Sequence, residues 1–218
     1  MDLPTHVCRR ALRPPRLDGT VTDPEWTRCD PLKLVLTTTG ETPRYATTAR
    51  LLWDEGFLYV AFVCEDPDIW GTLTQRDDPL YKEEVVEVFL DEDADESDYY
   101  EFEVSPRNVV IDLLVEWRGA RMWADPKWNC AGWRTAVHVE GTLDNRHDTD
   151  TRWSVEMAIP WAALANLPRR RLRAGDRMRL NLYRIDRAKD GDEYSAWSPT
   201  LGKSFHRPAR FGHLVLGE

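Results

Sequence analysis

The sequence has no long hydrophobic run. No stretch approaches the roughly 20 apolar residues that a membrane-spanning helix needs, and the first ten residues lack the apolar core of a signal peptide. We therefore expect a soluble protein with no membrane partner, which is either cytoplasmic or secreted after processing.

Cysteine is scarce as well. The four residues, Cys8, Cys29, Cys64 and Cys130, are widely scattered and form no CxxC pair, so a structural zinc site is not expected. Cys64 ends an apolar stretch and is expected to be a buried thiol. Cys8 and Cys29 could form a disulfide bond in an oxidising compartment, but their spacing leaves this open.

Basic residues are outnumbered by acidic ones. The chain has 29 Lys and Arg against 38 Asp and Glu, a net charge of −9, which argues against nucleic acid as a partner because a nucleic-acid groove needs basic stripes. The one basic cluster, Arg169, Arg170, Arg171 and Arg173, follows Pro168. We interpret it as a solvated turn rather than a phosphate site.

Short stretches of alternating polarity fill most of the 218 residues. They predict an all-β protein, an antiparallel β-sandwich of jelly-roll or immunoglobulin-like type. No linker or internal repeat interrupts them, so residues 1–218 are expected to form one domain, with 1–15 as an N-terminal extension. Short helical turns are expected near Pro24 and Pro160. The expected strands cover residues 32–38, 46–53, 57–64, 85–91, 99–104, 109–117, 133–140, 153–159, 178–185, 194–197 and 211–216.

The stretch from Tyr81 to Asp91 is the most informative part of the chain. Its alternation puts Val86, Val88 and Leu90 on one strand face and Glu87 with Phe89 on the other. A carboxylate beside aromatic rings suits a sugar, because rings cover the apolar faces of a pyranose and a carboxylate accepts its hydroxyls. An ordinary half-exposed strand would show the same pattern. Ten tryptophans in the chain favour the binding interpretation, since a core of this size needs fewer.

Six stretches, in this order and at compatible spacing, carry a family resemblance. They are Leu17-Asp18-Gly19 with Glu25-Trp26, residues 52–60, residues 86–91, residues 99–102, residues 156–161 and residues 207–212. The ordered set runs from about residue 16 to the C-terminus and resembles carbohydrate-binding module family 9, within the wider DOMON-like superfamily. The resemblance implies a β-sandwich that binds a mono- or oligosaccharide without cleaving it, and a separate glycoside hydrolase as a possible partner.

The resemblance also implies a site. Two tryptophans of the family sandwich a sugar ring, and their positions correspond to Tyr81 and Phe205. The family's hydrogen-bonding glutamate corresponds to Glu87. An arginine of the family corresponds to Glu103, which reverses the charge, and a glutamine falls near Tyr183.

Three further residues are candidate ligand contacts. Trp197 could form another wall of the site or belong to the core. Arg184, near a strand end, could pair with Glu87 or Glu103 or bind an acidic sugar, and His206 could contact the ligand or simply lie in a loop.

The acidic turn after residue 90 has the composition of a calcium loop. Asp91, Asp93, Asp95 and Asp98 lie close together there, although an acidic turn is usually only solvated and the EF-hand pattern is absent. The resemblance also implies that Ca²⁺ is a possible cofactor, because relatives in the family carry structural calcium. No other cofactor is expected.

Two alternatives to a binding module remain. Glu101 and Glu103 share one face of their strand, and Glu87 lies on the same face if the two strands pair. Glu87 with Glu103, or with Glu101, could therefore be the acid pair of a glycoside-cleaving enzyme. A haem-binding DOMON-like domain would need Met and His ligands, for which the candidates are Met122, Met157, Met178, His138 and His206.

Overall fold

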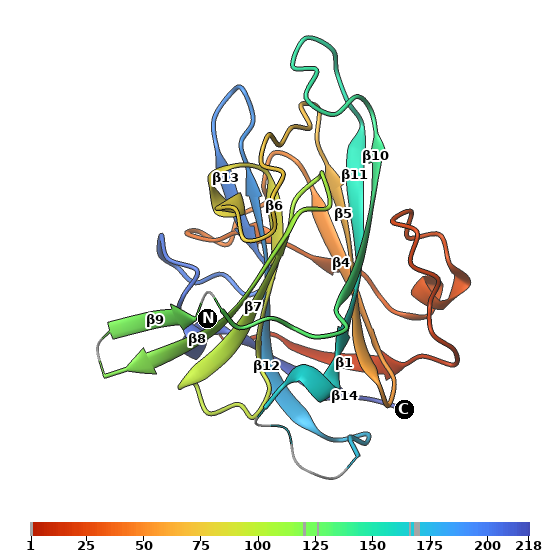
Figure 1. The fold of residues 1–218 in the computed structure, drawn as a ribbon, viewed down its shortest axis with the longest axis vertical. Coiled ribbons are helices and arrows are strands. Elements are labelled where there is room, and N and C mark those ends of the chain that lie inside the picture. Colours follow the sequence, from red (N-terminus) through yellow and green to blue (C-terminus); the bar gives the residue numbers. More distant parts are fainter. Residues whose placement is uncertain (1, 120, 126, 166, 168–170) are drawn as a thin grey trace.

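Two β-sheets pack face to face in this computed structural model, which describes residues 2–119, 121–125, 127–165, 167 and 171–218 (Figure 1). The predicted all-β sandwich is confirmed. Arg169 and Arg170 of the basic cluster lie outside the described residues. Among the described residues, no helix is both long and apolar enough to span a membrane.

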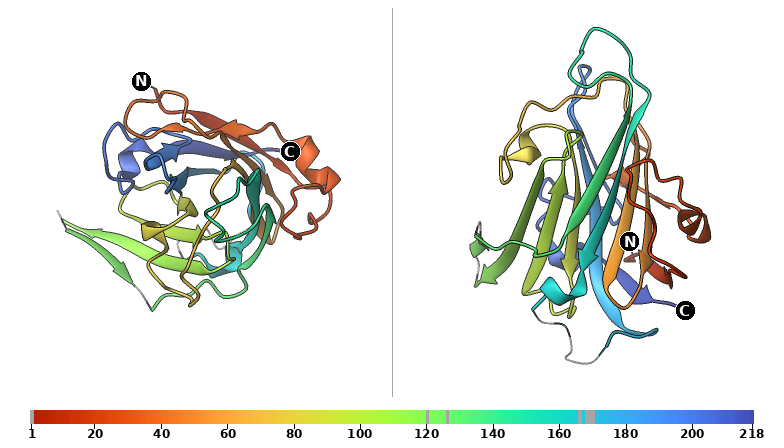
Figure 2. Two further views of the ribbon diagram at one scale, coloured as in Figure 1. Left: turned by 90° about the horizontal axis from the view of Figure 1, so that it is seen from above. Right: turned by 45° about the vertical axis from the view of Figure 1, so that its right-hand side comes forward.

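The first sheet carries the candidate site and is almost entirely antiparallel. Its central order is β14-β12-β6-β7-β8-β9, and β13 extends it by pairing with β12 and β3. The sheet curls towards β9 (Figure 2). The strands are β3 (Val35–Leu36), β6 (Val85–Asp91), β7 (Asp98–Val104), β8 (Val110–Arg118), β9 (Arg121–Asp125), β12 (Arg177–Asp186), β13 (Glu193–Ala196) and β14 (Gly212–Leu216).

The second sheet has the order β10-β11-β5-β4, with β2 paired to β4. All these pairs are antiparallel. The pairs β4–β5 and β10–β11 join consecutive strands, whereas β5 and β11 are distant in the chain. The strands are β2 (Leu32–Lys33), β4 (Thr47–Trp53), β5 (Phe57–Glu65), β10 (Arg134–Glu140) and β11 (Arg152–Pro160). The predicted strand over 32–38 is therefore split into two short pieces, β2 and β3.

The N-terminal segment contains a strand that was not predicted. Within the expected N-terminal extension, Thr5–Arg10 forms strand β1. Its first half pairs in parallel with β14, and Arg9 and Arg10 pair in parallel with Leu52 and Trp53 of β4. Strand β1 therefore joins the two sheets, and the sandwich is not purely antiparallel.

In the part of the chain that the structure describes, four 3-10 turns accompany the strands: η1 (Pro24–Arg28), η2 (Leu80–Lys82), η3 (Trp161–Ala163) and η4 (Pro208–Arg210). The helical turns expected near Pro24 and Pro160 are confirmed as η1 and η3. The turn η2 holds Tyr81, and η4 follows the loop that holds Phe205, so both unpredicted turns border the site.

Three apolar clusters hold the layers together. The largest lies between the sheets and includes Val86, Val88 and Leu90 of β6. A second covers the outer face of the first sheet and includes Phe89, Tyr183 and Phe205. A third packs η1 through Trp26 against the outer face of the second sheet. The two faces of β6 thus belong to different clusters, as its alternation predicts.

Candidate functional site

Three glutamates form the floor of a pocket on the outer face of the first sheet. Glu87 of β6 is directly opposite Glu103 of β7, and Glu101 is opposite Phe89. Side chains of directly opposite residues point to the same face of a sheet. One carboxylate oxygen from each glutamate lies within 4.8 Å of the others, and all three side chains are at least nine-tenths buried.

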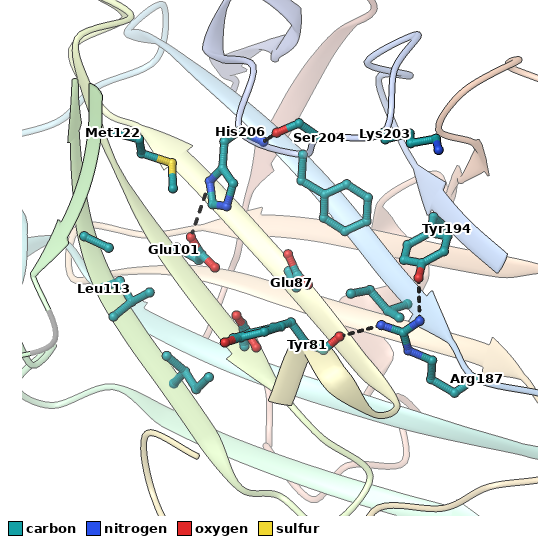
Figure 3. A pocket seen from close by; sticks show the side chains of 15 residues that line it. Tyr81, Glu87, Glu101, Leu113, Met122, Arg187, Tyr194, Lys203, Ser204 and His206 are labelled. Carbon is teal, nitrogen blue, oxygen red and sulfur yellow. Dashed lines mark hydrogen bonds and ion pairs between the residues drawn. The ribbon is translucent and has the colours of Figure 1, made fainter. Parts of the chain in front are cut away.

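The pocket has a volume of about 620 Å³ and mostly apolar walls (Figure 3). Strands β8 and β9 supply one wall, and the turn η2 and the loop before η4 supply the others. Its lining consists of Tyr81, Glu87, Glu101, Glu103, Ile111, Leu113, Met122, Ala124, Ile185, Arg187, Tyr194, Lys203, Ser204, Phe205 and His206. Apolar walls with a few convergent polar groups are typical of ligand sites.

A layer of stacked rings supports the pocket. Phe205 stacks on Tyr183, with ring centroids 4.2 Å apart, and the Tyr183 hydroxyl donates to the Phe205 carbonyl at 2.9 Å. Phe89 packs between Tyr183 and Tyr99, at centroid distances of 4.9 and 5.4 Å. One face of Phe205 is therefore covered, and its position is fixed from below.

The glutamate floor is electrostatically unusual. Burial raises the pKa of Glu101 to about 7. Burial, together with the neighbouring carboxylates, raises the pKa of both Glu87 and Glu103 well above the ordinary value. His206 Nδ1 lies 3.9 Å from Glu101 Oε2, but burial lowers the pKa of His206 to about 4. Because His206 is then neutral at pH 7, it does not offset the charge of Glu101.

Four of the predicted contacts, Tyr81, Glu87, Glu103 and Phe205, line this one pocket, and His206 joins them. Tyr81 is 50% exposed and Phe205 is 8% exposed. The Tyr81 carbonyl accepts a hydrogen bond from Arg187 at 2.8 Å, and Arg187 also bonds the Tyr194 hydroxyl. Tyr81 and Phe205, distant in the chain, thus border the same cavity.

Three predicted contacts, Tyr183, Trp197 and Arg184, lie elsewhere. Tyr183 is fully buried beneath Phe205, so it supports the site without lining it. Trp197 belongs to the cluster between the sheets, and only 8% of it is exposed. The alternative of a core tryptophan is the one that the structure shows.

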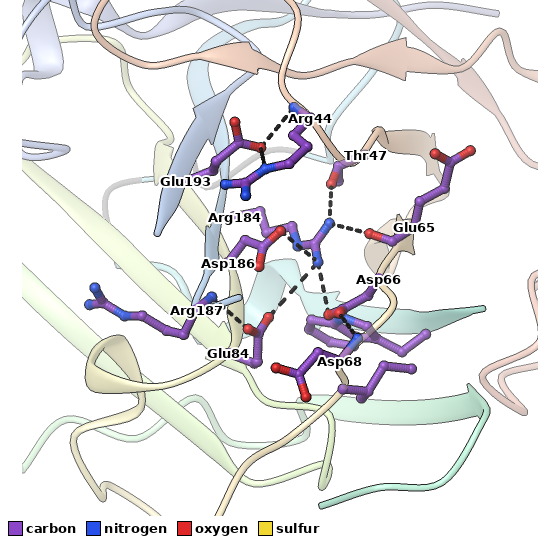
Figure 4. A network of polar contacts seen from close by, with 12 residues as sticks. Arg44, Thr47, Glu65, Asp66, Asp68, Glu84, Arg184, Asp186, Arg187 and Glu193 are labelled. Atoms are coloured by element: carbon purple, nitrogen blue, oxygen red, sulfur yellow. Dashed lines mark hydrogen bonds and ion pairs between the residues drawn. The ribbon is translucent and has the colours of Figure 1, made fainter. Parts of the chain in front are cut away.

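The prediction that Arg184 pairs with Glu87 or Glu103 is wrong. Its guanidinium lies on the opposite face of β12, where it bonds Asp66 at 2.9 Å and lies 3.4 Å from Asp186 and 3.9 Å from Glu84 (Figure 4). It also donates to the Thr47 hydroxyl and the Glu65 carbonyl. Arg184 therefore ties β12 to the second sheet and does not contact the pocket.

Sequence reasoning missed Glu101, Arg187 and Tyr194 as pocket residues. Glu101 was predicted to share a face with Glu103, so the alternation of β7 already contained the signal. No comparable signal exists for Arg187 and Tyr194, because they lie at the two ends of a turn whose path the sequence does not specify.

The acidic turn brings three of its four aspartates together. Carboxylate oxygens of Asp91, Asp93 and Asp95 lie within 4.8 Å of one another, whereas Asp98 is outside this group. Asp91 is fully buried, burial raises its pKa to about 7, and its Oδ1 has no hydrogen-bond partner among the described residues. A buried carboxylate oxygen without a donor fits a cation.

The cysteines and the haem candidates are also placed. Cys8, Cys29, Cys64 and Cys130 are buried free thiols. Met157 and Met178 lie in the core, and His138 is exposed on β10. Met122 and His206 both line the pocket. His206 already uses Nδ1 in a 2.7 Å hydrogen bond with the Tyr99 hydroxyl, and three buried carboxylates would face a porphyrin there.

Sequence comparison finds multidomain relatives. Exoglucanase XynX of Acetivibrio thermocellus is 26% identical over 98% of this chain, which covers 17% of that protein. Endo-1,4-beta-xylanase A of Thermoanaerobacterium saccharolyticum is 25% identical over 93% of this chain and 15% of its own length. The chain thus spans less than a fifth of these relatives.

Solved structures share the fold. A putative carbohydrate-binding protein from Bacteroides uniformis has a TM-score of 0.80 at 16% identity, over 99% of this chain and all of its own. A carbohydrate binding module family 9 from Caldicellulosiruptor kristjanssonii, in complex with cellotriose, has a TM-score of 0.65 at 18% identity, over 97% of this chain and 94% of its own.

The family described as carbohydrate family 9 binding domain-like matches residues 17–218. This match covers nearly all of the chain and includes every residue of the pocket, so the protein belongs to the carbohydrate family 9 binding domain-like family.

Proposed function

We propose that this protein binds a saccharide, without cleaving it, in the pocket between Tyr81, Phe205 and the three glutamates. The observation that carries the proposal is the combination of ring and aliphatic walls with hydrogen-bonding carboxyl groups at the floor. Rings favour the C–H faces of a sugar, and carboxyl groups bond its hydroxyls. Membership of the family and the cellotriose and glucose complexes of its solved members support this assignment.

The partner is proposed from the relatives. Their names are those of an exoglucanase and of xylanases, so the polysaccharides of plant cell walls are the first ligands to test. In this proposal the domain holds such a polysaccharide for a glycoside hydrolase, which can be a separate protein.

The geometry argues against the rival function, a glycoside-cleaving enzyme. Glu87 and Glu103 are directly opposite each other and project from the same sheet face. A glycosidase needs one carboxyl group on each side of the scissile bond. The glutamates of this pocket lie side by side beneath a ligand rather than on either side of a bond within it.

Isothermal titration with cello- and xylo-oligosaccharides tests the proposal. Tyr81→Ala should weaken the binding about tenfold, because a stacking ring contributes on the order of 1 kcal/mol beyond the area that it buries. Glu87→Gln should also weaken binding. The matched control is Tyr45→Ala, a partly exposed tyrosine that does not line this pocket.

Two results would contradict the proposal. One is binding that Tyr81→Ala and Tyr45→Ala affect equally, which would place the ligand elsewhere. The other is turnover of a glycoside that Glu87→Gln abolishes, which would make the protein an enzyme.

We also propose a structural calcium site in the turn between β6 and β7. Asp91, Asp93 and Asp95 would supply its carboxylate oxygens, since hard cations prefer oxygen ligands. The support is the buried, unpartnered Oδ1 of Asp91 among the described residues, beside two further carboxylates.

A further inference from the structure

Two carboxylate oxygens at the floor of the pocket are unpaired among the described residues. Oε2 of Glu101 and Oε2 of Glu103 are buried and have no hydrogen-bond partner there. A buried charge is costly unless it is paired. Glu87 brings a third carboxyl group to this cluster at the bottom of an open pocket, so the partner of these oxygens is expected to come from a ligand.

The nearby basic groups do not fill this role. Arg187 lowers the pKa of Glu87 through its charge, but its guanidinium bonds Asp192, the Tyr194 hydroxyl and the Tyr81 carbonyl. The ammonium of Lys203 points away from the glutamates (Figure 3). Burial keeps His206 neutral by lowering its pKa to about 4.

The carboxylates lie close enough together for all three to bind one primary ammonium group. Such a group has three N–H donors in tetrahedral directions. With N···O distances of about 2.8 Å, its three acceptors lie about 4.6 Å apart. The oxygens of Glu87, Glu101 and Glu103 lie within 4.8 Å of one another, so each carboxylate can accept one N–H.

The size and the apolar walls of the pocket indicate a ligand larger than a single cation. The volume of about 620 Å³ far exceeds that of one ion, and Ile111, Leu113, Met122 and Phe205 offer it apolar surface. The ligand must therefore combine an ammonium group with C–H faces that pack on rings and aliphatic side chains.

We propose that the saccharide of this pocket is an amino sugar with a free primary amine, held by an ammonium group seated between Glu87, Glu101 and Glu103. This inference rests on the proposed saccharide binding and names the class of sugar. The sugar ring lies against the walls above, and the exposed ring of Tyr81 borders its outer side.

Three matched trisaccharides test the inference at pH 6, where the sugar amine already carries its proton. Chitosan trisaccharide, triacetylchitotriose and cellotriose share a β-1,4-linked backbone and differ at C2, where they carry an ammonium, an acetamide and a hydroxyl group. Isothermal titration should give at least tenfold tighter binding of the amine than of either neutral trimer. Binding should release protons, seen as a dependence of the heat on the buffer, because the cation lowers the raised pKa values of the glutamates.

Variants test the seat of the ammonium group. Glu103→Gln should reduce the preference for the amine over cellotriose to less than threefold, because the lost charge weakens the binding of the amine more than that of the neutral trimer. Glu140→Gln removes one charge from the surface of β10, far from the pocket lining, and should leave the preference unchanged. An equal loss in both variants would show only a general attraction of a cationic oligosaccharide to an acidic protein, and would overturn the inference.

The remaining outcomes separate this inference from the proposed function. If cellotriose binds as tightly as chitosan trisaccharide, the inference fails and saccharide binding stands. If none of the three trimers nor any cello- or xylo-oligosaccharide binds, the proposed function fails too. A third outcome is that Mn²⁺ or Ca²⁺ binds with micromolar affinity, that Glu103→Gln abolishes this metal binding, and that the amine does not compete with the metal. In that case the glutamate cluster is a metal site and the inference is wrong.

Discussion

A buried glutamate with one oxygen that accepts no hydrogen bond is a local cost to the folded state. Glu101 loses its hydration on folding and gains no donor for Oε2 among the described residues. Its neighbours on the pocket face are Glu87, Glu103, His206 and the Tyr99 hydroxyl, and none of these supplies a positive charge at neutral pH. The fold therefore has to bear this cost, as binding sites commonly require.

Glu101→Gln should stabilise the free protein at neutral pH. The pKa of Glu101 is about 7 when folded, against an ordinary value of 4.5, so the wild-type protein loses stability as the pH rises from about 4.5 to 7. The amide does not titrate and avoids this loss, which amounts to roughly 3 kcal/mol. Urea denaturation at pH 4.5 and pH 7.5 measures the difference in unfolding free energy between Glu101→Gln and the wild type. This difference should be larger at pH 7.5.

Glu140→Gln is the control for that measurement. Hydrogen bonding by Arg152 lowers the pKa of Glu140, so its carboxylate favours the folded state, and the amide should give no gain at pH 7.5. A Glu101→Gln advantage that does not change with pH would show that Glu101 is not destabilised by its charge.

Strand alternation decides which residues the sequence could place. Glu87, Glu101 and Glu103 were predicted on one face, and the pairing of β6 with β7 confirms this. The same rule separates neighbours: Tyr183 and Arg184 must point to opposite faces of β12. The assignment of both to one site therefore conflicted with the period of the strand, and Arg184 is indeed on the other side.

At the scale of elements, the motif residues Gly19, Trp26 and Glu156, which carry part of the family resemblance, stabilise the fold and do not line the pocket. The Glu156 carboxylate accepts hydrogen bonds from the backbone N–H groups of Asp18 and Gly19 and from Trp26 Nε1, at 2.6 to 2.7 Å. Gly19 has φ +84°, and a Cβ there would lie 2.4 Å from the Val137 carbonyl carbon. These motif residues reveal the fold, whereas the identity of the ligand depends on side chains outside them.

Strand β1 could not be predicted for a different reason. Val7 and Leu12 are exposed, and Thr5–Arg10 has little hydrophobic alternation. The segment becomes a strand because β14, from the other end of the chain, offers it a parallel edge. Such a pairing depends on the assembled fold rather than on local propensity.

The turn between β6 and β7 gives a prediction of its own. Millimolar Ca²⁺ should raise the melting temperature by a few degrees, because a ligand that binds only the folded state stabilises it. Asp91→Asn should abolish this gain, since Asp91 is the buried member of the trio. Differential scanning calorimetry with calcium and with EDTA measures the effect.

Asp98→Asn is the matched control in the same turn. Asp98 was predicted to be a ligand, but it lies outside the carboxylate group, so the variant should keep most of the calcium effect. A melting temperature that does not respond to calcium in the wild type would rule out the site.

At the scale of the whole molecule, the sandwich is held by apolar layers and by one buried ion network. Arg184 of β12 is 1% exposed and reaches across the gap between the sheets to Asp66, Thr47 and the Glu65 carbonyl. Glu84 and Asp186 complete the group, and burial raises the pKa of Asp186 to about 6. Three acids, Asp66, Glu84 and Asp186, therefore lie against the guanidinium of Arg184.

Arg184→Met should destabilise the protein by about 3–5 kcal/mol at pH 7, since removing one partner of a buried pair leaves uncompensated charge. The loss should be smaller at pH 5, where Asp66, Glu84 and Asp186, whose pKa values burial raises, take up protons more readily. Arg152→Met is the control: it breaks the exposed pair with Glu140, and should cost less than about 1 kcal/mol at either pH. Guanidinium denaturation of both variants decides the matter. Equal losses of unfolding free energy in the two variants would mean that the apolar layers alone hold the two sheets together. A large loss confined to Arg184→Met, and smaller at pH 5, would show that the ion network joins one sheet to the other. The network would then also fix the strands from which the three pocket glutamates project.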